Sequence, residues 1–434
     1  MVFVFPREDE ITSEVVEKFI EEHKKLVPSY LYNKNMYEGR HEILTREARD
    51  TYKPDNRIVV NFARMMVDTF NGFFNGIPVK VSHDKEQVEA FLGVFSGVNG
   101  IEDSEAELAK LTSIYGHAYE YIYQDEEARS RLLASTPIDT FLVYDDSVIG
   151  SRLFAVRYQY DYEGLLVGEL VDSVNRYKIR ENEKGAITIE EGSPHYYGGV
   201  PVIEYVENEE RQSLFENAKT LINALNKAIS AKMDDVDYFA DSYLKVIGAD
   251  LDEETMTDLR ANRTINLTGD GANDVTIEFL AKPDADQTQE NLIDRLIDLI
   301  FQVSMVVNMN DSKFGNDPSG VSLRYKSQQM NNLAISKERK FQRSMQRRYK
   351  LLFQLPTNVP SNLRDEWAYL EYAFTRNEPK NLAEEAEVAT KLEGVVSKET
   401  QLRLLSIVKD AKVEMERIEK ENEPLPEYDS EKGV

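Results

Sequence analysis

The sequence of 434 residues contains no cysteine. This absence excludes disulfide bonds, a thiol nucleophile and every zinc site built on thiolate ligands. Basic residues are also scarce, because 52 lysines and arginines stand against 78 aspartates and glutamates, which gives a formal net charge of −26. Proteins that wrap duplex DNA need a basic footprint, because neutralising phosphates supplies most of the affinity. We therefore expect that this chain does not grip DNA over its whole surface.

The sequence motifs of common enzyme classes are missing as well. The sequence has no G-x-x-x-x-G-K-[ST] loop, no G-x-G-x-x-G and no G-x-S-x-G, and its five histidines are scattered. Carboxylates cluster at 234–237 and 284–286, but without the glycine and bidentate glutamate of a calcium-binding loop. We predict no catalytic residue, no cofactor and no metal site, so the chain is not expected to be an enzyme. A metal-dependent nucleic-acid enzyme that uses these carboxylates is an alternative.

Long uncharged apolar runs are lacking too. The most apolar stretch, 292–309, contains Asp294, Arg295 and Asp298. A membrane-spanning helix needs about 20 predominantly apolar residues, so this stretch is expected to be a buried helix and no membrane partner is predicted. Residues 2–5 are apolar but lack the basic and long apolar regions of a signal peptide.

The first half of the chain is predicted to combine helices and short strands. Apolar residues at helical spacing predict helices over 9–27, 59–74, 84–95 and 102–116, and the first of these is expected to end before Pro28. Short aromatic or β-branched runs separated by turns predict antiparallel strands. These runs lie at 119–123, 141–144, 153–160, 165–171, 176–181, 186–190 and 202–206.

Long helices dominate the second half. They are predicted over 211–241, 288–308 and 321–353. Between the first two lies a small module, predicted to contain strands 243–247, 264–267 and 275–280 and helix 252–260. A short helix with an extended piece is predicted over 361–376, and two helices over 381–395 and 397–420 precede an acidic tail.

The second long helix, 288–308, is apolar on nearly all sides. Such a helix must be buried, and neighbouring copies of the chain could cover it. Two long helices that flank a small α/β module are an unusual plan for a monomer, whereas a closed cyclic oligomer supplies the missing cover.

The third long helix concentrates positive charge. Residues 320–354 contain nine basic residues and one acidic residue, in a chain with a net charge of −26. We favour the interpretation that these residues pair with acidic groups on an adjacent domain or subunit, because charge complementarity fixes register. Direct contact with phosphates is the alternative. The candidate residues of this basic helix are Lys337, Arg339, Lys340, Arg343, Arg347 and Arg348.

A polar loop joins the second and third long helices. A loop is usually only a connection, but two strongly periodic helices would fix the position of this one. Lys313 and Phe314 are its only sizeable side chains that offer a cation and a stacking surface. The candidate residues of the loop are Asn310, Asp311, Ser312, Lys313, Phe314, Gly315, Asn316 and Asp317.

Seven short segments form an ordered set. They are 37–44 (YEGRHEIL), 54–62 (PDNRIVVNF), 67–78 (VDTFNGFFNGIP), 237–244 (DYFADSYL), 290–296 (ENLIDRL), 319–326 (SGVSLRYK) and 337–341 (KERKF). In this order and spacing they resemble the portal proteins of tailed bacteriophages, in particular the family typified by siphophages of Gram-positive hosts. Each segment is moderately specific, and the whole set covers most of the chain.

The resemblance implies an α+β portal fold assembled as a ring, typically of twelve subunits. The implied parts are a wing (1–210), a first stem helix (211–242), a clip (243–283), a second stem helix (284–309), a tunnel loop (310–320), a long helix (321–354), a wing return (355–380) and a short crown with the acidic tail (381–434). The stem residues expected to pack subunits together are Leu221, Leu225, Ile297, Leu299, Ile300 and Phe301. The tunnel loop is expected to line the narrowest point of a channel.

The function implied by the resemblance is passage of double-stranded DNA through one capsid vertex during packaging and ejection. The implied partners are further copies of the chain, the DNA, the terminase large subunit, capsid and scaffolding proteins and a head-tail adaptor. The implied location is the virion, with assembly in the host cytoplasm. An adaptor of another assembly that uses the long helices to bind partners is a competing hypothesis.

Overall fold

The computed structural model describes residues 2–48, 54–240, 244–247, 276–279, 286–308, 320–377, 382–405, 407–408 and 411–421. These residues fall into two compact units. The first comprises Met1–Val307 and Gln329–Thr375, and the second comprises Asn308–Gln328 and Arg376–Val434. The first unit contains both helices and sheets, which confirms the predicted α+β class.

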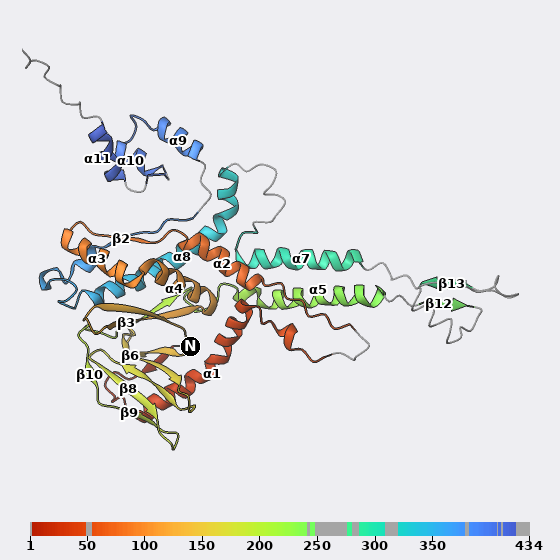
Figure 1. Cartoon of the computed structure of the whole chain (residues 1–434), viewed down its shortest axis with the longest axis horizontal. Coiled ribbons are helices and arrows are strands. Elements are labelled where there is room, and N and C mark those ends of the chain that lie inside the picture. Colours follow the sequence, from red (N-terminus) through yellow and green to blue (C-terminus); the bar gives the residue numbers. More distant parts are fainter. Residues whose placement is uncertain are drawn as a thin grey trace, which may run out of the picture. The chain divides into compact units, whose positions relative to one another are not determined.

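A seven-stranded sheet organises one part of the first unit (Figure 1). Its order is β1-β5-β6-β7-β8-β10, and β9 pairs with β8. The strands are β1 (Phe3–Phe5), β5 (Thr140–Asp145), β6 (Arg152–Tyr160), β7 (Leu166–Val171), β8 (Asn175–Glu181), β9 (Ile187–Ile189) and β10 (Ser193–Pro194). β1 runs parallel to β5, and the other pairs are antiparallel.

Helix α1 (Ser13–Glu38) packs its apolar side chains against this sheet. Phe19 and Ile20 of the helix share a core with Phe3, Phe141 and Phe154 of the strands. Alternation along the strands puts every second side chain into this core and leaves the others on the opposite face of the sheet.

A larger core lies around a three-stranded sheet of order β11-β3-β4. The strands are β11 (Val202–Val206), β3 (His117–Gln124) and β4 (Ser130–Ser135). Helices α2 (Phe62–Asn75), α3 (Glu86–Asn99), α4 (Ile101–Tyr115) and the second half of α8 (Gly320–Leu352) contribute to the same core. Two short strands, β2 (Lys80–Ser82) and β14 (Glu371–Ala373), pair antiparallel, and 3₁₀ turns at Ser361–Leu363 and Glu366–Tyr369 precede β14.

Helices α5 (Lys219–Ala240) and α7 (Asp286–Ser304) lie side by side (Figure 1). Strands β12 (Leu244–Ile247) and β13 (Thr276–Phe279) form a separate antiparallel ladder. The second unit contains residues 320–328 of α8 and the helices α9 (Leu382–Lys391), α10 (Lys398–Arg403) and α11 (Ala411–Glu421).

Several predicted boundaries were wrong. α1 does not end before Pro28 but continues to Glu38, where Gly39 adopts a left-handed conformation with φ of 83°. A proline removes one helical hydrogen bond, and the packing of residues on both sides of Pro28 outweighs that loss. The first long helix begins at Lys219 rather than at 211, because a 3₁₀ turn at Glu216–Ala218 precedes it.

Other elements were missed or lie outside the described residues. β4 was not predicted, although it pairs with β3 along its whole length. The single helix predicted over 397–420 is two helices, α10 and α11. The predicted helix 252–260 and strand 264–267 lie outside the described residues.

Candidate functional site

Helices α5 and α7 bury one face of their pair. Leu225, predicted as a stem residue, is fully buried, as is Ile300 on α7. Leu221 and Ile297 are half-buried against the same core. Polar side chains also join the helices, because Gln289 Nε2 donates to Asp235 Oδ2 at 2.8 Å.

Other apolar side chains of the two helices, and Met305 directly after α7, are uncovered. The exposed fraction is 40% for Met233, 52% for Val236, 53% for Leu292 and 46% for Met305. The predicted stem residues Leu299 and Phe301 are half-buried, and the Phe301 ring meets Phe62 edge-on at 5.5 Å. The helix pair by itself therefore covers only part of its apolar surface.

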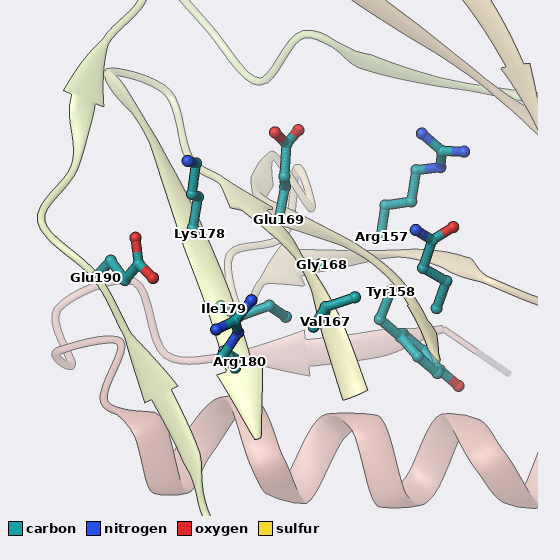
Figure 2. Close-up of a pocket in the computed structure, with 10 residues that line it drawn as sticks. Arg157, Tyr158, Val167, Gly168, Glu169, Lys178, Ile179, Arg180 and Glu190 are labelled. Atoms are coloured by element: carbon teal, nitrogen blue, oxygen red, sulfur yellow. The ribbon is translucent and has the colours of Figure 1, made fainter. Parts of the chain in front are cut away.

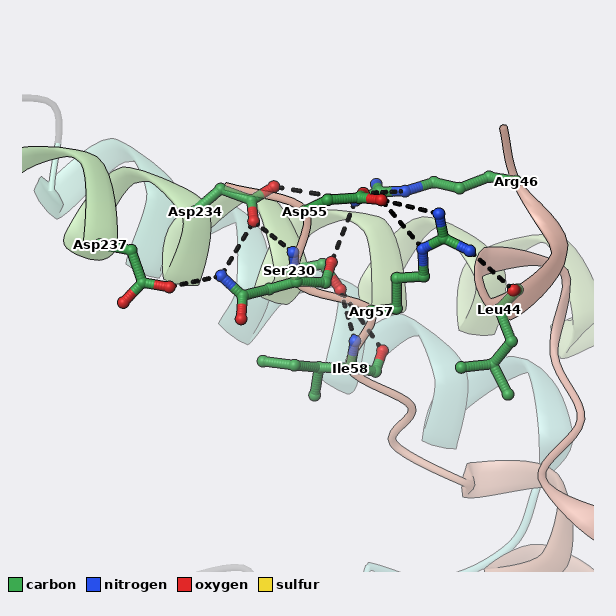
Figure 3. A network of polar contacts seen from close by, with 9 residues as sticks. Leu44, Arg46, Asp55, Arg57, Ile58, Ser230, Asp234 and Asp237 are labelled. Carbon is green, nitrogen blue, oxygen red and sulfur yellow. Dashed lines mark hydrogen bonds and ion pairs between the residues drawn. The ribbon is translucent and has the colours of Figure 1, made fainter. Parts of the chain in front are cut away.

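An extended segment, residues 56–60, is fastened to α5 by a polar ladder (Figure 3). The backbone N–H of Asn56 donates to Asp234 Oδ1 at 2.6 Å, and that of Ile58 donates to Ser230 Oγ at 2.9 Å. The N–H of Val60 donates to Asn226 Oδ1 at 2.8 Å. Two residues of extended chain advance about 6.6 Å, and four residues of an α-helix advance about 6 Å. Because these two distances are similar, the N–H of every second residue in the segment meets an acceptor on every fourth residue of α5.

Charged groups close the end of this ladder (Figure 3). Asp55 accepts hydrogen bonds from Arg57 and Arg46, which lower the pKa of its carboxyl to about 2. Asn56 Nδ2 donates to Asp237 Oδ2 at 2.6 Å and also contacts Asp234. The carboxylates of the 234–237 cluster thus accept hydrogen bonds from the protein itself. Within the described ranges, no three ligand side chains come together to hold a metal ion.

Lys337, a candidate of the basic helix, is buried inside the first unit. Its Nζ lies 2.6 Å from a carboxylate oxygen of Glu207 and donates to the Ala109 carbonyl and to Ser113 Oγ. Burial lowers the pKa of Lys337, and Glu207 opposes that shift. The amine also lies over the Phe74 ring at 5.2 Å from its centroid. This lysine holds α8 against other elements of its own chain.

Arg348 is the second buried cation of α8. Its Nη1 lies 2.5 Å from Glu105 Oε1, and its Nε and Nη2 donate to the two oxygens of Glu120 at 2.8 and 2.7 Å. The Tyr205 hydroxyl donates to the same Glu120 carboxylate. Burial raises the pKa of Glu105, and the charge of Arg348 opposes that shift. A bidentate pairing of this kind fixes orientation as well as charge.

The remaining candidates of the basic helix lie at or near the surface. Arg339 and Arg343 are exposed. Lys340 forms an ion pair with Glu209. Arg347 is half-buried, and its Nε has no hydrogen-bond partner among the described residues. The structure thus separates six residues that the sequence grouped together.

The tunnel-loop candidates Asn310, Asp311, Ser312, Lys313, Phe314, Gly315, Asn316 and Asp317 lie outside the described residues. Their role stays a prediction.

Two sets of residues in the site were not predicted from the sequence. The acidic partners of α8, Glu105, Glu120 and Glu207, gave no local signal because they are far from α8 along the chain. The ladder acceptors had a signal that was overlooked. Asn226, Ser230 and Asp234 recur every four residues on a helix whose neighbouring faces are apolar.

The face of the seven-stranded sheet that points away from α1 carries an open groove of about 360 Å³ (Figure 2). Glu169 lies directly opposite Arg157 on one neighbouring strand and Lys178 on the other, and the three side chains point away from α1. Glu169 also accepts a hydrogen bond from the Tyr121 hydroxyl. Gly168 is required here, because a Cβ would come within 2.2 Å of the Arg157 carbonyl oxygen. Strand pairing alone accounts for this face, and its lining residues form no catalytic arrangement.

Within the part of the chain that the structure describes, no helix has the length and apolar character to cross a membrane.

Comparison with known proteins assigns a family. A profile of the family described as "Phage portal protein, SPP1 Gp6-like" matches residues 16–425. The portal protein of Bacillus phage SPP1 is 24% identical over 437 residues, covering 94% of this chain and 86% of the relative. The portal protein of Clostridium phage phiCD119 is 21% identical over 406 residues, covering 86% of this chain and 87% of the relative.

A solved structure, "Neck of empty GTA particle computed with C6 symmetry", contains a chain with a TM-score of 0.47 and 11% identity, covering 79% of this chain and 89% of that one. The family match rests on sequence and extends over nearly the whole length, from within α1 to beyond the last residue of α11. The chain belongs to the SPP1 Gp6-like family of phage portal proteins.

Proposed function

We propose that copies of this chain form a closed ring, of twelve subunits by family analogy, around a channel for double-stranded DNA at one vertex of the capsid. The observation that carries this proposal is uncovered apolar surface on the α5–α7 pair and directly after α7, where Met233, Val236, Leu292 and Met305 are at least 40% exposed. Apolar surface of this kind marks a site of association. A ring of identical subunits covers it without leaving an open end.

The proposed parts are those that the family resemblance implies. The wing comprises 1–210 with the return 355–380, the stem helices lie within 211–242 and 284–309, and the clip is 243–283. The tunnel loop is 310–320, the long helix 321–354 and the crown 381–434. The polar ladder between residues 56–60 and α5 supports a wing and first stem helix that act as one body.

DNA must pass through such a ring without being held. A net charge of −26 per chain favours a wall that repels phosphate on average. Salt screens charges beyond about 8 Å at physiological ionic strength, so the repulsion stays close to the wall. In this proposal Lys313 and Phe314 of the tunnel loop supply the few direct contacts.

The proposed partners are the terminase large subunit, which docks on the clip and supplies ATP hydrolysis, then the head-completion and tail proteins, with capsid and scaffolding proteins around the ring. The sequence has no phosphate-binding loop, so this chain is proposed to have no ATPase activity of its own. The proposed location is the portal vertex of the virion, with assembly in the host cytoplasm.

Native mass spectrometry with negative-stain imaging of the full chain tests the proposal. We expect a closed ring of about a dozen copies with a central channel. Monomers or dimers at micromolar concentration, also in the presence of scaffolding protein, would contradict it and favour an adaptor that binds partner helices.

A further inference from the structure

Two arginines of the first unit lack the acidic partners that its other buried cations have. Arg152 begins β6, and Arg347 lies on α8, one residue before the fully paired Arg348. Both side chains are half-buried, and the Nε of each is buried without a hydrogen-bond partner. Among the described residues, neither guanidinium has an ion-pair partner.

The positive charge of Arg152 acts on Arg347. Burial lowers the pKa of Arg347 to about 10, and the positive charge of Arg152 contributes to that shift. Placing two like charges together in a partly desolvated site is unfavourable unless an anion lies between them.

The acidic residue that Tyr144 connects to Arg152 is already engaged. Arg152 lies over the Tyr144 ring, at 5.9 Å from its centroid, and the Tyr144 hydroxyl donates to Glu204 at 2.7 Å. Glu204 in turn accepts two hydrogen bonds from Arg211, at 2.6 and 2.8 Å. Its carboxylate is therefore satisfied and does not neutralise Arg152 or Arg347.

Local backbone makes room for the Arg347 head group. A Cβ at Gly199 would come within 2.9 Å of Arg347 Nη2 and 3.4 Å of Leu351 Cδ2. Glycine at this position lets the guanidinium lie against the backbone.

We propose that Arg152 and Arg347 together bind a carboxylate side chain of an adjacent copy of this chain, so that one ion cluster forms at each subunit contact. The proposal rests on the ring proposed above. Guanidinium groups match the planar, two-oxygen geometry of a carboxylate. A chain with 78 acidic and 52 basic residues presents carboxylates in excess, so a second copy is the anion source that every ring supplies.

Ring stability in solution tests this proposal. The variants Arg152→Gln and Arg347→Gln keep the size and polarity of the side chain but remove its charge. We expect each to raise, by about tenfold or more, the subunit concentration at which half of the chains are in rings. Arg364→Gln removes an exposed arginine of the same unit and serves as the matched control, with no expected change.

Two further measurements separate this role from a structural one. Urea unfolding of the dissociated subunit should show no loss of stability in Arg347→Gln, because the variant removes an unpaired buried charge. Arg152→Gln should lose only the small contribution of its contact with the Tyr144 ring. The Arg347→Lys variant should keep the rings, and a carbodiimide should then couple its amine to a carboxylate of the neighbouring subunit, which mass spectrometry would identify.

The outcomes distinguish the possible failures. If the wild-type chain forms no rings, the proposed function fails first. If rings form and both glutamine variants assemble like the control, only the carboxylate site is wrong. If inorganic phosphate stabilises the subunit through Arg347 while ring stability is unaffected by either variant, the site binds a free anion and the subunit contact is refuted.

Discussion

Helix α8 buries two positive charges, Lys337 and Arg348, and its own chain pairs the first with one carboxylate and the second with two. The α5–α7 pair differs, because it leaves apolar side chains such as Val236 and Leu292 about half exposed. Burial of an unpaired charge costs far more than exposure of an apolar side chain. A subunit that must exist before assembly therefore has to pair its buried cations with its own carboxylates. Its exposed apolar side chains can remain uncovered until neighbouring subunits bury them.

The largest expected effect concerns the internal pairing of α8. The Arg348→Met variant leaves Glu105 and Glu120 buried without their cation, which should lower the free energy of unfolding by about 3–5 kcal/mol. Urea denaturation of the dissociated subunit measures this loss. Arg343→Met, on the exposed side of the same helix, should change it by less than about 0.5 kcal/mol. Equal stability of the two variants would show that α8 is not anchored by its buried charge.

A pH titration tests whether other buried groups are also satisfied internally. Burial lowers the pKa of His23 and of His117 to about 4, from 6.5. Between these values the unfolded chain binds protons that the folded chain does not. Stability is therefore complete above pH 6.5 and is lost as the pH falls towards 4, by up to about 3 kcal/mol per histidine.

The variant His23→Gln shows how much of this loss of stability at low pH comes from His23. His23 Nδ1 lies 2.8 Å from the Tyr158 hydroxyl, and Nε2 lies 2.9 Å from the Pro137 carbonyl oxygen. Unfolding measured at pH 5 and pH 7.5 should show a smaller difference in the variant than in the wild type. An unchanged difference would mean that His23 takes up its proton equally in both states.

The polar ladder on α5 should contribute less to the free energy of unfolding than the buried ion pairs of α8 do. The Ser230→Ala variant leaves the Ile58 N–H without its acceptor, at a cost of about 1–2 kcal/mol in subunit stability. Ser336→Ala, at an exposed position of α8, is the matched control. Hydrogen exchange at Ile58 should accelerate in the first variant alone, and protection equal to the control would contradict the ladder.

The smallest effect on the subunit is expected at the exposed side of the helix pair. The Leu292→Asp variant should change subunit stability by less than about 0.5 kcal/mol, yet should prevent ring formation, because the ring would bury the new charge. Val148→Asp places the same change on a fully exposed loop and should leave rings intact. Intact rings in both variants would show that this side of α7 is not a subunit contact.

Much of the fold was predictable because its signals are local. The runs at 141–144, 153–160 and 202–206 each became strands within a residue or two of the predicted ends. The third long helix was placed within one residue at each end, since apolar periodicity over many turns depends only on the helix itself. The second begins within two residues of the predicted start but ends at Ser304 rather than at 308. The predicted end of α1 at Pro28 was wrong because it considered only the local effect of proline on a helix. The buried residues Asn33 and Met36 beyond Pro28 pack against other elements and sustain the helix.

The candidate site was less predictable. The sequence showed that α8 is basic but could not show that Lys337 and Arg348 point inwards while Arg339 and Arg343 face solvent. Those two orientations differ by a rotation about the helix axis, and only the surrounding elements select one of them. The acidic partners also come from α4, β3 and the end of β11, which no spacing rule connects to α8.

The sequence by itself determined the acidic character of the chain, the α+β class, the long helices and the portal family, because composition, periodicity and short ordered segments are properties of neighbouring residues. The tertiary structure decided which charges are neutralised within the subunit, which N–H groups of residues 56–60 meet α5, and which apolar side chains of α5 and α7 stay uncovered. These depend on pairings between segments that are distant in sequence, and such pairings are selected by the fit of whole surfaces and by the cost of leaving a buried polar group alone.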